Sequence, residues 1–250
     1  MADQLFAAVE RMHGERRWGS VLDAGTGLHS LRWISALPTT RWTAVTGDAR
    51  RETRLLRELG GAVRPDDRIL TGNWTDPSLL HGEVHDVVIA DYLLGALDGF
   101  APYFQDRLFG RLRPVVGSRL YVIGLAPYEP PTDEGGNLIW EIARLRDACI
   151  LLAGHRCYRE YPMDWVVRSL ERSGFVVQSA TPMPILYGPR FVNGQLDVCT
   201  RKLPLFQDRA LAASMGEHIE AVRVKALDHI TRHQHIRFGE DYVIAAEPAG

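Results

Sequence analysis

The residues with the clearest chemical potential form a glycine-rich turn that follows a short apolar strand near residue 22. An amphipathic helix begins directly after this turn. Glycines at positions 25 and 27 let the backbone approach a ligand closely, because they carry no Cβ. The N–H groups and the positive dipole end of the following helix point into the same crevice. The pattern predicts a nucleotide-cofactor loop, with a ligand-free strand–helix turn as the alternative, and its candidate residues are Asp23, Gly25, Thr26, Gly27 and Ser30.

The details of the turn distinguish between two kinds of cofactor. A dinucleotide fingerprint has the pattern Gly-x-Gly-x-x-Gly, whereas Ser30 stands here at the third position and Asp23 precedes the first glycine. A carboxylate beside the loop repels a pyrophosphate but attracts the sulfonium and ammonium groups of S-adenosylmethionine. The turn resembles motif I of the class I S-adenosylmethionine-dependent methyltransferases, Asp/Glu-x-Gly-x-Gly, with His29 in place of the usual third glycine. A hydride-transferring Rossmann enzyme is a weaker alternative.

Apolar runs alternate with helical patterns along the chain, which is typical of a parallel sheet with crossover helices. Seven strands in this order match the sheet of the class I methyltransferases, whose last strand is antiparallel. The expected fold is α/β: a doubly wound, mostly parallel seven-stranded sheet with helices on both faces and helical insertions over the crevice. The expected strands are 19–24, 42–47, 67–72, 85–90, 118–125, 175–181 and 241–246, and the expected helices are 30–37, 49–60, 100–113, 138–153, 164–173 and 205–232.

Two segments are longer than the bare fold needs. Residues 126–163 follow the fifth expected strand, and residues 182–238 separate the sixth from the seventh. Loops after the carboxyl ends of the strands face the ligand crevice in such sheets. We therefore predict a single methyltransferase domain over 1–250, in which both segments are insertions that build the substrate pocket or its lid. An Asn193-Gly194 turn is expected in the second segment, whose long helix alternatively covers a sheet edge or mediates a dimer.

The resemblance also implies roles for residues at the ends of the next three strands. Asp48 corresponds to the acid that accepts both ribose hydroxyl groups, and it also has the spacing of a helix N-cap. Asn73 is placed to accept from the adenine amino group, with Trp74 against the ring. Asp91 and Tyr92 resemble motif IV, where an acid lines the sulfonium side or acts as a base and an aromatic ring stabilises the cation.

The methyl acceptor is less well defined by the sequence. Methyl transfer needs alignment and exclusion of water, and a general base helps when the acceptor is a phenol, alcohol or ammonium. His155 is the first candidate for this base, followed by Asp91. Tyr92 is the third catalytic candidate, with a ring for the sulfonium or a hydroxyl group for the acceptor. Aromatic side chains in and near the insertions favour an O or N atom of a small aromatic or amphipathic molecule. A peptide methyltransferase and a non-catalytic cofactor-binding subunit are the alternatives, and the candidate substrate contacts are Tyr92, Tyr103, Trp140, Tyr158 and Arg190.

Composition narrows the range of partners. The 250 residues carry a formal net charge of −2, so no strong field for nucleic acid is expected. The three cysteines are irregularly spaced, which favours reduced thiols over disulfide bonds. No segment approaches the 18 consecutive apolar residues that a membrane-spanning helix needs. We therefore expect a cytoplasmic protein that takes a small-molecule substrate and binds neither membrane nor nucleic acid, with a homodimer left open.

Two further clusters of charged or metal-binding residue types are not predicted to form a binding site. Arginines at 50, 51, 54 and 57 alternate with two glutamates, which indicates a solvated helix face. Histidines at 229 and 233 have the i, i+4 spacing of zinc ligands, but no clear third ligand accompanies them. No metal site is predicted.

Overall fold

A computed structural model describes residues 4–250 of the protein. The chain forms two compact units. The sheet unit comprises the chain up to Ala126 together with Tyr158–Met183 and Asp241–Gly250, and the helical unit comprises Pro127–Cys157 and Pro184–Glu240. The segments that the sequence marks as insertions therefore form most of a unit with its own core.

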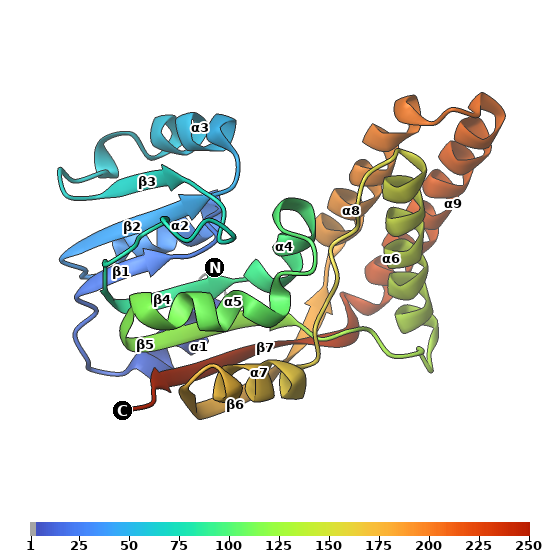
Figure 1. Ribbon diagram of the computed structural model, residues 1–250. Coiled ribbons are helices and arrows are strands. Elements are labelled where there is room, and N and C mark those ends of the chain that lie inside the picture. The colour runs from blue at the N-terminus through green and yellow to red at the C-terminus, as the bar shows by residue number, and fades with distance from the viewer. Residues whose placement is uncertain (1–3) are drawn as a thin grey trace. The chain divides into compact units, whose positions relative to one another are not determined.

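The sheet has seven strands in the order β3-β2-β1-β4-β5-β7-β6 (Figure 1). Strands β1 to β5 are parallel to one another, and β7 runs antiparallel to β5 with Leu125 opposite Asp241. This confirms the expected mostly parallel α/β sheet. The strands are β1 Ser20–Asp23, β2 Arg41–Thr46, β3 Arg68–Thr71, β4 His85–Asp91, β5 Val116–Leu125, β6 Phe175–Tyr187 and β7 Ile236–Pro248.

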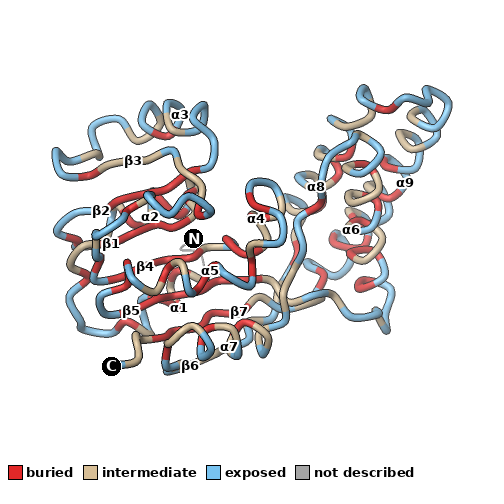
Figure 2. Tube along the Cα trace, in the orientation of Figure 1, coloured by how far each residue is buried: buried red, intermediate tan, exposed pale blue. Residues whose placement is uncertain are grey.

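One face of the sheet is covered by α1 (Gln4–His13), α2 (Leu28–Ala36) and α3 (Ala49–Leu59). Their apolar sides share a core with Trp42 and Tyr121 from the strands. The central strands are buried on both faces, as the red segments of Figure 2 show. Such strands are apolar almost continuously rather than in alternation.

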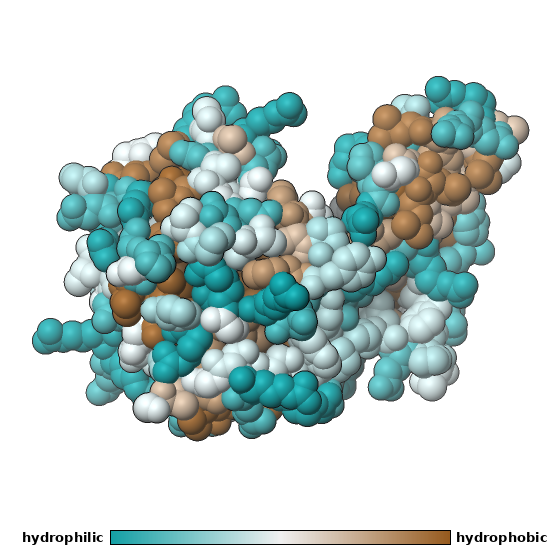
Figure 3. Space-filling model, in the orientation of Figure 1, coloured by the Kyte–Doolittle hydropathy of each residue, from teal (hydrophilic) through white to brown (hydrophobic). Residues whose placement is uncertain are grey.

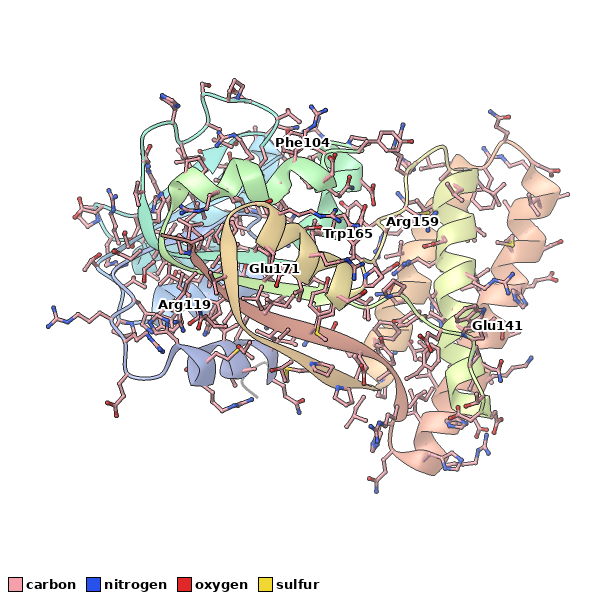
Figure 4. The ribbon with its side chains drawn as sticks, turned by 60° about the horizontal axis from the view of Figure 1, so that its bottom comes forward. Phe104, Arg119, Glu141, Arg159, Trp165 and Glu171 are labelled. Atoms are coloured by element: carbon pink, nitrogen blue, oxygen red, sulfur yellow. The ribbon has the colours of Figure 1, made fainter. Side chains whose placement is uncertain are left out.

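The opposite face carries α4 (Leu93–Phe100), α5 (Gln105–Leu112) and α7 (Met163–Arg172). Figure 4 shows α5 and α7 beside each other on this face, with Phe104 and Trp165 marking their positions. The helix expected at 100–113 is present as α5, although it begins only at Gln105, and α4 before it was not predicted. Helices therefore cover both faces, which confirms the doubly wound arrangement.

Three helices build the helical unit: α6 (Glu134–Leu152), α8 (Pro189–Lys202) and α9 (Arg209–His233). The expected Asn193-Gly194 turn is wrong, because both residues lie inside α8. Pro189 occupies the first turn of α8, a position that proline favours, and Val192, Leu196 and Cys199 follow at helical spacing on its buried side. This periodic apolar stripe outweighs the local turn preference of Asn-Gly.

The helical unit also presents apolar side chains to solvent, visible as brown areas in Figure 3. Even so, no helix within residues 4–250 has the length and apolar character to cross a membrane. The larger exposed apolar residues of this unit are Leu151, Leu152, Leu186, Leu205, Leu211 and Val224.

Candidate functional site

An open pocket with an empty volume of about 480 Å³ lies at the carboxyl ends of β1, β2 and β3. β1 has β2 on one side and β4 on the other, so the strand order reverses beside it. Ligands bind at such switch points in open α/β sheets. The lining residues are Ala24, Gly25, Thr26, Val45, Thr46, Gly47, Arg51, Gly72, Asn73, Trp74, Leu93, Ala96, Leu97 and Phe100.

The glycine turn is packed tightly against α4. A Cβ at Gly25 would lie 2.7 Å from Cδ1 of Leu93, and one at Gly47 would lie 2.5 Å from Cδ1 of Phe100. A larger residue at either position would therefore force the side chain of Leu93 or Phe100 to move. Gly27 differs, since a Cβ there would meet only Nη2 of Arg51, at 3.9 Å.

Asp23 lies behind this turn and is fully buried. Its Oδ2 accepts a hydrogen bond of 2.8 Å from the Ser30 hydroxyl group, whose oxygen accepts from the Gly27 amide at 3.1 Å. Oδ1 has no hydrogen-bond partner within residues 4–250. Burial raises the pKa of Asp23 to about 6, and the bond from Ser30 opposes that shift. Asp23 and Ser30 thus brace the loop from below rather than lining the pocket.

Trp74 forms a wall of the pocket and connects two strand ends. It is 3% exposed, and its indole Nε1 donates a hydrogen bond of 2.7 Å to the Ala24 carbonyl oxygen. The Arg111 guanidinium group lies 5.5 Å from the centre of the ring, within reach of a cation–π interaction. The indole therefore holds the loop after β3 against the glycine turn.

Asn73 and Asp48 both have structural partners. The amide Nδ2 of Asn73 donates to the Phe100 carbonyl oxygen at 2.7 Å, and its Oδ1 accepts from the amide and hydroxyl groups of Thr75. The exposed Asp48 caps α3, because its Oδ1 accepts from the Arg50 amide at 2.9 Å. Asn73 lines the pocket, whereas Asp48 follows the lining residue Gly47.

Asp91 and Tyr92 stand where β4 ends and α4 begins. Tyr92 has a left-handed backbone with φ of 46°, which is uncommon for a residue with a large side chain. Its hydroxyl group donates to Oδ1 of Asp241 at 2.7 Å. Since Asp241 pairs with Leu125, the last residue of β5, this bond joins the end of β4 to β7 at the ligand edge of the sheet. Neither Asp91 nor Tyr92 lines the pocket.

The remaining candidate residues also lie outside the pocket lining. In the helical unit, His155 is exposed with Nδ1 3.4 Å from Nζ of Lys202, and that unit also contains Trp140 and Arg190. Tyr103 is 85% exposed, and Tyr158 packs against Gly99 of α4. Their contacts with a substrate stay predictions.

Sequence reasoning missed the charged side chain in the pocket. Arg51 was assigned to a solvated helix face, yet it lines the cavity from the first turn of α3. The available signal was its position: the first turn of a helix that follows a parallel strand lies at the ligand edge of the sheet. The apolar wall from α4 was missed because that helix was not predicted.

Within residues 4–250, no group of three or more His, Cys, Asp or Glu side chains has the arrangement of a metal site. His229 and His233 stack with ring centres 4.4 Å apart, and Nδ1 of His229 lies 3.5 Å from a carboxylate oxygen of Glu134.

Solved structures with a similar arrangement are methyltransferases and related enzymes. A candidate methyltransferase from Bacillus halodurans matches with a TM-score of 0.64 and 12% identity, over 99% of this chain and all of the other. The protein has the class I methyltransferase fold. No protein-family model and no curated protein sequence matches the chain.

Two other structures show how varied the proteins with this fold are. A cyclopropane synthase from Mycobacterium tuberculosis has a TM-score of 0.57 and 14% identity, over 97% of this chain and 83% of the other. Phosphoethanolamine N-methyltransferase 2 from Haemonchus contortus, in complex with phosphomonomethylethanolamine and S-adenosylhomocysteine, has a TM-score of 0.56 and 12% identity. That match covers 99% of this chain and 52% of the other. The fold alone thus leaves the acceptor open.

Proposed function

We propose that the protein binds S-adenosylmethionine in the pocket at β1–β3 and transfers its methyl group to an O or N atom of a small molecule. The observation that carries this proposal is the position of the turn that resembles motif I, which forms one wall of a pocket at the switch point of the sheet. The acceptor that we favour is aromatic or amphipathic.

The pocket residues fit the chemical groups of this cofactor. Trp74, Phe100 and Val45 offer apolar surface for adenosine, and Asp48 stands beside the lining for the ribose hydroxyl groups. The buried Oδ1 of Asp23, which lacks a hydrogen-bond partner within residues 4–250, adds negative charge behind the loop. S-adenosylmethionine supplies a methyl group on a cationic sulfonium, so negative charge and apolar walls that exclude water suit it.

Tyr92 is the residue that we favour as a contact for the acceptor. Its hydroxyl group donates a hydrogen bond to Asp241, and the residue directly precedes Leu93, which lines the pocket. Asp91 precedes it at the end of β4. We propose these two residues, with His155 as a further candidate base, for orienting the acceptor and receiving its proton.

Calorimetric titration with S-adenosylmethionine, S-adenosylhomocysteine and NADH tests the proposal. We expect micromolar binding of the first two ligands and none of NADH. Binding of NADH alone, or of none of the three ligands, would contradict the proposal.

Incubation with S-adenosylmethionine and a panel of phenols, amines and peptides then distinguishes a small-molecule enzyme from a peptide methyltransferase or a non-catalytic subunit. Sedimentation of the same sample tests the homodimer, which stays a prediction.

Substitution of Asp48 by serine should weaken S-adenosylhomocysteine binding about tenfold or more, because a hydrogen bond to a charged group is worth roughly 1.5–3 kcal/mol. Serine is chosen because it preserves the N-cap of α3. The melting temperature should therefore change little. Unchanged affinity in a folded variant would remove Asp48 from the cofactor site.

A further inference from the structure

Arg51 is the charged residue of the pocket. Among the described residues that line the cavity, it alone carries a formal charge. Its side chain lies beside the glycine turn, with Nη2 3.9 Å from where a Cβ of Gly27 would stand. Its guanidinium group makes no hydrogen bond or ion pair with any other residue of 4–250, whereas Arg54, one turn further along α3, pairs with Glu58 at 2.6 Å.

An arginine that is the one charged residue among the described lining residues, and whose guanidinium group has no hydrogen-bond or ion-pair partner among residues 4–250, favours a ligand with an anionic group. Much of the lining is apolar, including Val45, Leu93, Leu97 and Phe100, whereas Arg51 is exposed at the pocket and its guanidinium group is accessible to a ligand. The Arg51 guanidinium group acts electrostatically on the Asp23 carboxylate, but that carboxylate is fully buried and accepts a hydrogen bond from Ser30. The planar guanidinium group presents paired N–H donors that match the two oxygens of a carboxylate.

We infer that Arg51 binds the α-carboxylate of the methionine part of the cofactor, and so selects cofactors that carry this group. The inference rests on the proposed function. S-adenosylmethionine has one anionic group at neutral pH, the α-carboxylate. Gly25, Thr26 and Gly27, next to the guanidinium group, form the turn that resembles motif I, which the resemblance assigns to the methionine end of the ligand.

The test compares two ligands that differ in the amino-acid part. S-adenosylhomocysteine carries the α-carboxylate, and 5′-methylthioadenosine keeps the adenosine and the sulfur but lacks it. Calorimetry would measure both ligands with the native protein, Arg51→Gln and Arg54→Gln. The Arg54 variant removes the same charge from the same helix outside the pocket. NADH serves as an anionic ligand of the competing cofactor class.

In Arg51→Gln, we expect S-adenosylhomocysteine to bind about 10- to 100-fold more weakly, as for loss of a hydrogen bond to a charged group. Binding of 5′-methylthioadenosine should change less than about twofold, because it has no group for Arg51 to hold. Arg54→Gln should bind both ligands like the native protein. Arg51→Lys should recover part of the lost affinity, since it restores the charge without the two-pronged geometry.

Three results would overturn the inference, and they differ from failure of the proposed function. Unchanged S-adenosylhomocysteine affinity in Arg51→Gln shows that the carboxylate binds elsewhere. Equal losses for both ligands show that Arg51 shapes the adenosine site instead. Equal losses in the Arg51 and Arg54 variants show a general charge effect. If the native protein binds neither adenosyl ligand, or binds NADH instead, the proposed function itself fails.

Discussion

Replacement of Trp74 by alanine is expected to destabilise the protein by about 3–5 kcal/mol, the range for truncating a large buried aromatic side chain. The indole is almost completely buried and belongs to the core that packs under α4 and α5. Its removal leaves a cavity and also deprives the Ala24 carbonyl oxygen of its hydrogen bond. The contact of the Arg111 guanidinium group with the ring is lost as well.

Urea denaturation of Trp74→Ala and Trp74→Phe, compared with the native protein, measures this effect. Phenylalanine keeps much of the apolar volume but cannot donate to Ala24, so it should cost about 1–3 kcal/mol. The order native, phenylalanine, alanine is expected in the free energy of unfolding. A loss below about 1 kcal/mol in the alanine variant would show that the loop after β3 does not depend on the indole. Because the chain forms two units, unfolding should be followed by more than one probe.

The sequence predicts the sheet well because each parallel strand is a short apolar run followed by a polar turn. It also predicts that Gly25, Thr26, Asn73 and Trp74 converge, since the carboxyl ends of parallel strands share one edge. Local pattern and global topology agree at these positions. The sheet and these lining positions can therefore be predicted from the sequence.

The sequence did not predict α4, and the reason is its glycines. Gly95 and Gly99 lower helix propensity, so the segment resembles a loop. In the structure, a Cβ at Gly95 would lie 3.0 Å from the Arg159 carbonyl oxygen, and one at Gly99 would lie 3.0 Å from the Tyr158 ring. The glycines are needed by packing against a segment some 60 residues away in the chain, which no local pattern contains.

Side-chain roles were also harder to predict than positions. Asn73 was assigned to adenine because of its place after β3, but its amide group bonds to Phe100 and Thr75. Trp74 was assigned to the ligand, and its indole nitrogen bonds to the glycine turn. Such partners come from other loops, so the type of residue and its position on a strand end do not determine them.

Asp23 should make the stability of the protein decrease between about pH 4 and pH 6. Its pKa rises from an ordinary value of 3.8 to about 6, because burial disfavours the charged form. Below the unfolded pKa both states are protonated, and the carboxyl group carries no penalty. As the pH rises, the unfolded state ionises first, so stability falls until the folded pKa is passed. A shift of about two units corresponds to about 3 kcal/mol.

Comparison of Asp23→Asn with the native protein isolates this effect, because the titration of other groups cancels in the difference. The free energy of unfolding of the variant, minus that of the native protein, should grow by about 3 kcal/mol from pH 4 to pH 7. Asp86→Asn is the matched control. Hydrogen bonds from Ser20 lower the pKa of Asp86, so its contribution to stability is lost only as the pH falls below about 4. The difference in unfolding free energy between Asp86→Asn and the native protein should therefore change little between pH 5 and pH 7.

If the difference in unfolding free energy between Asp23→Asn and the native protein does not change with pH, the protein stabilises the charged carboxylate of Asp23 as well as water does.

The charge of Asp23 should also affect ligand binding. If the methionine part binds above Asp23, its ammonium group favours the charged carboxylate, and S-adenosylhomocysteine affinity should fall as the pH drops below about 6. That loss should be absent in Asp23→Asn, whose side chain does not ionise. A loss that persists in the variant would assign the pH dependence to another group and leave Asp23 with only its role in bracing the turn.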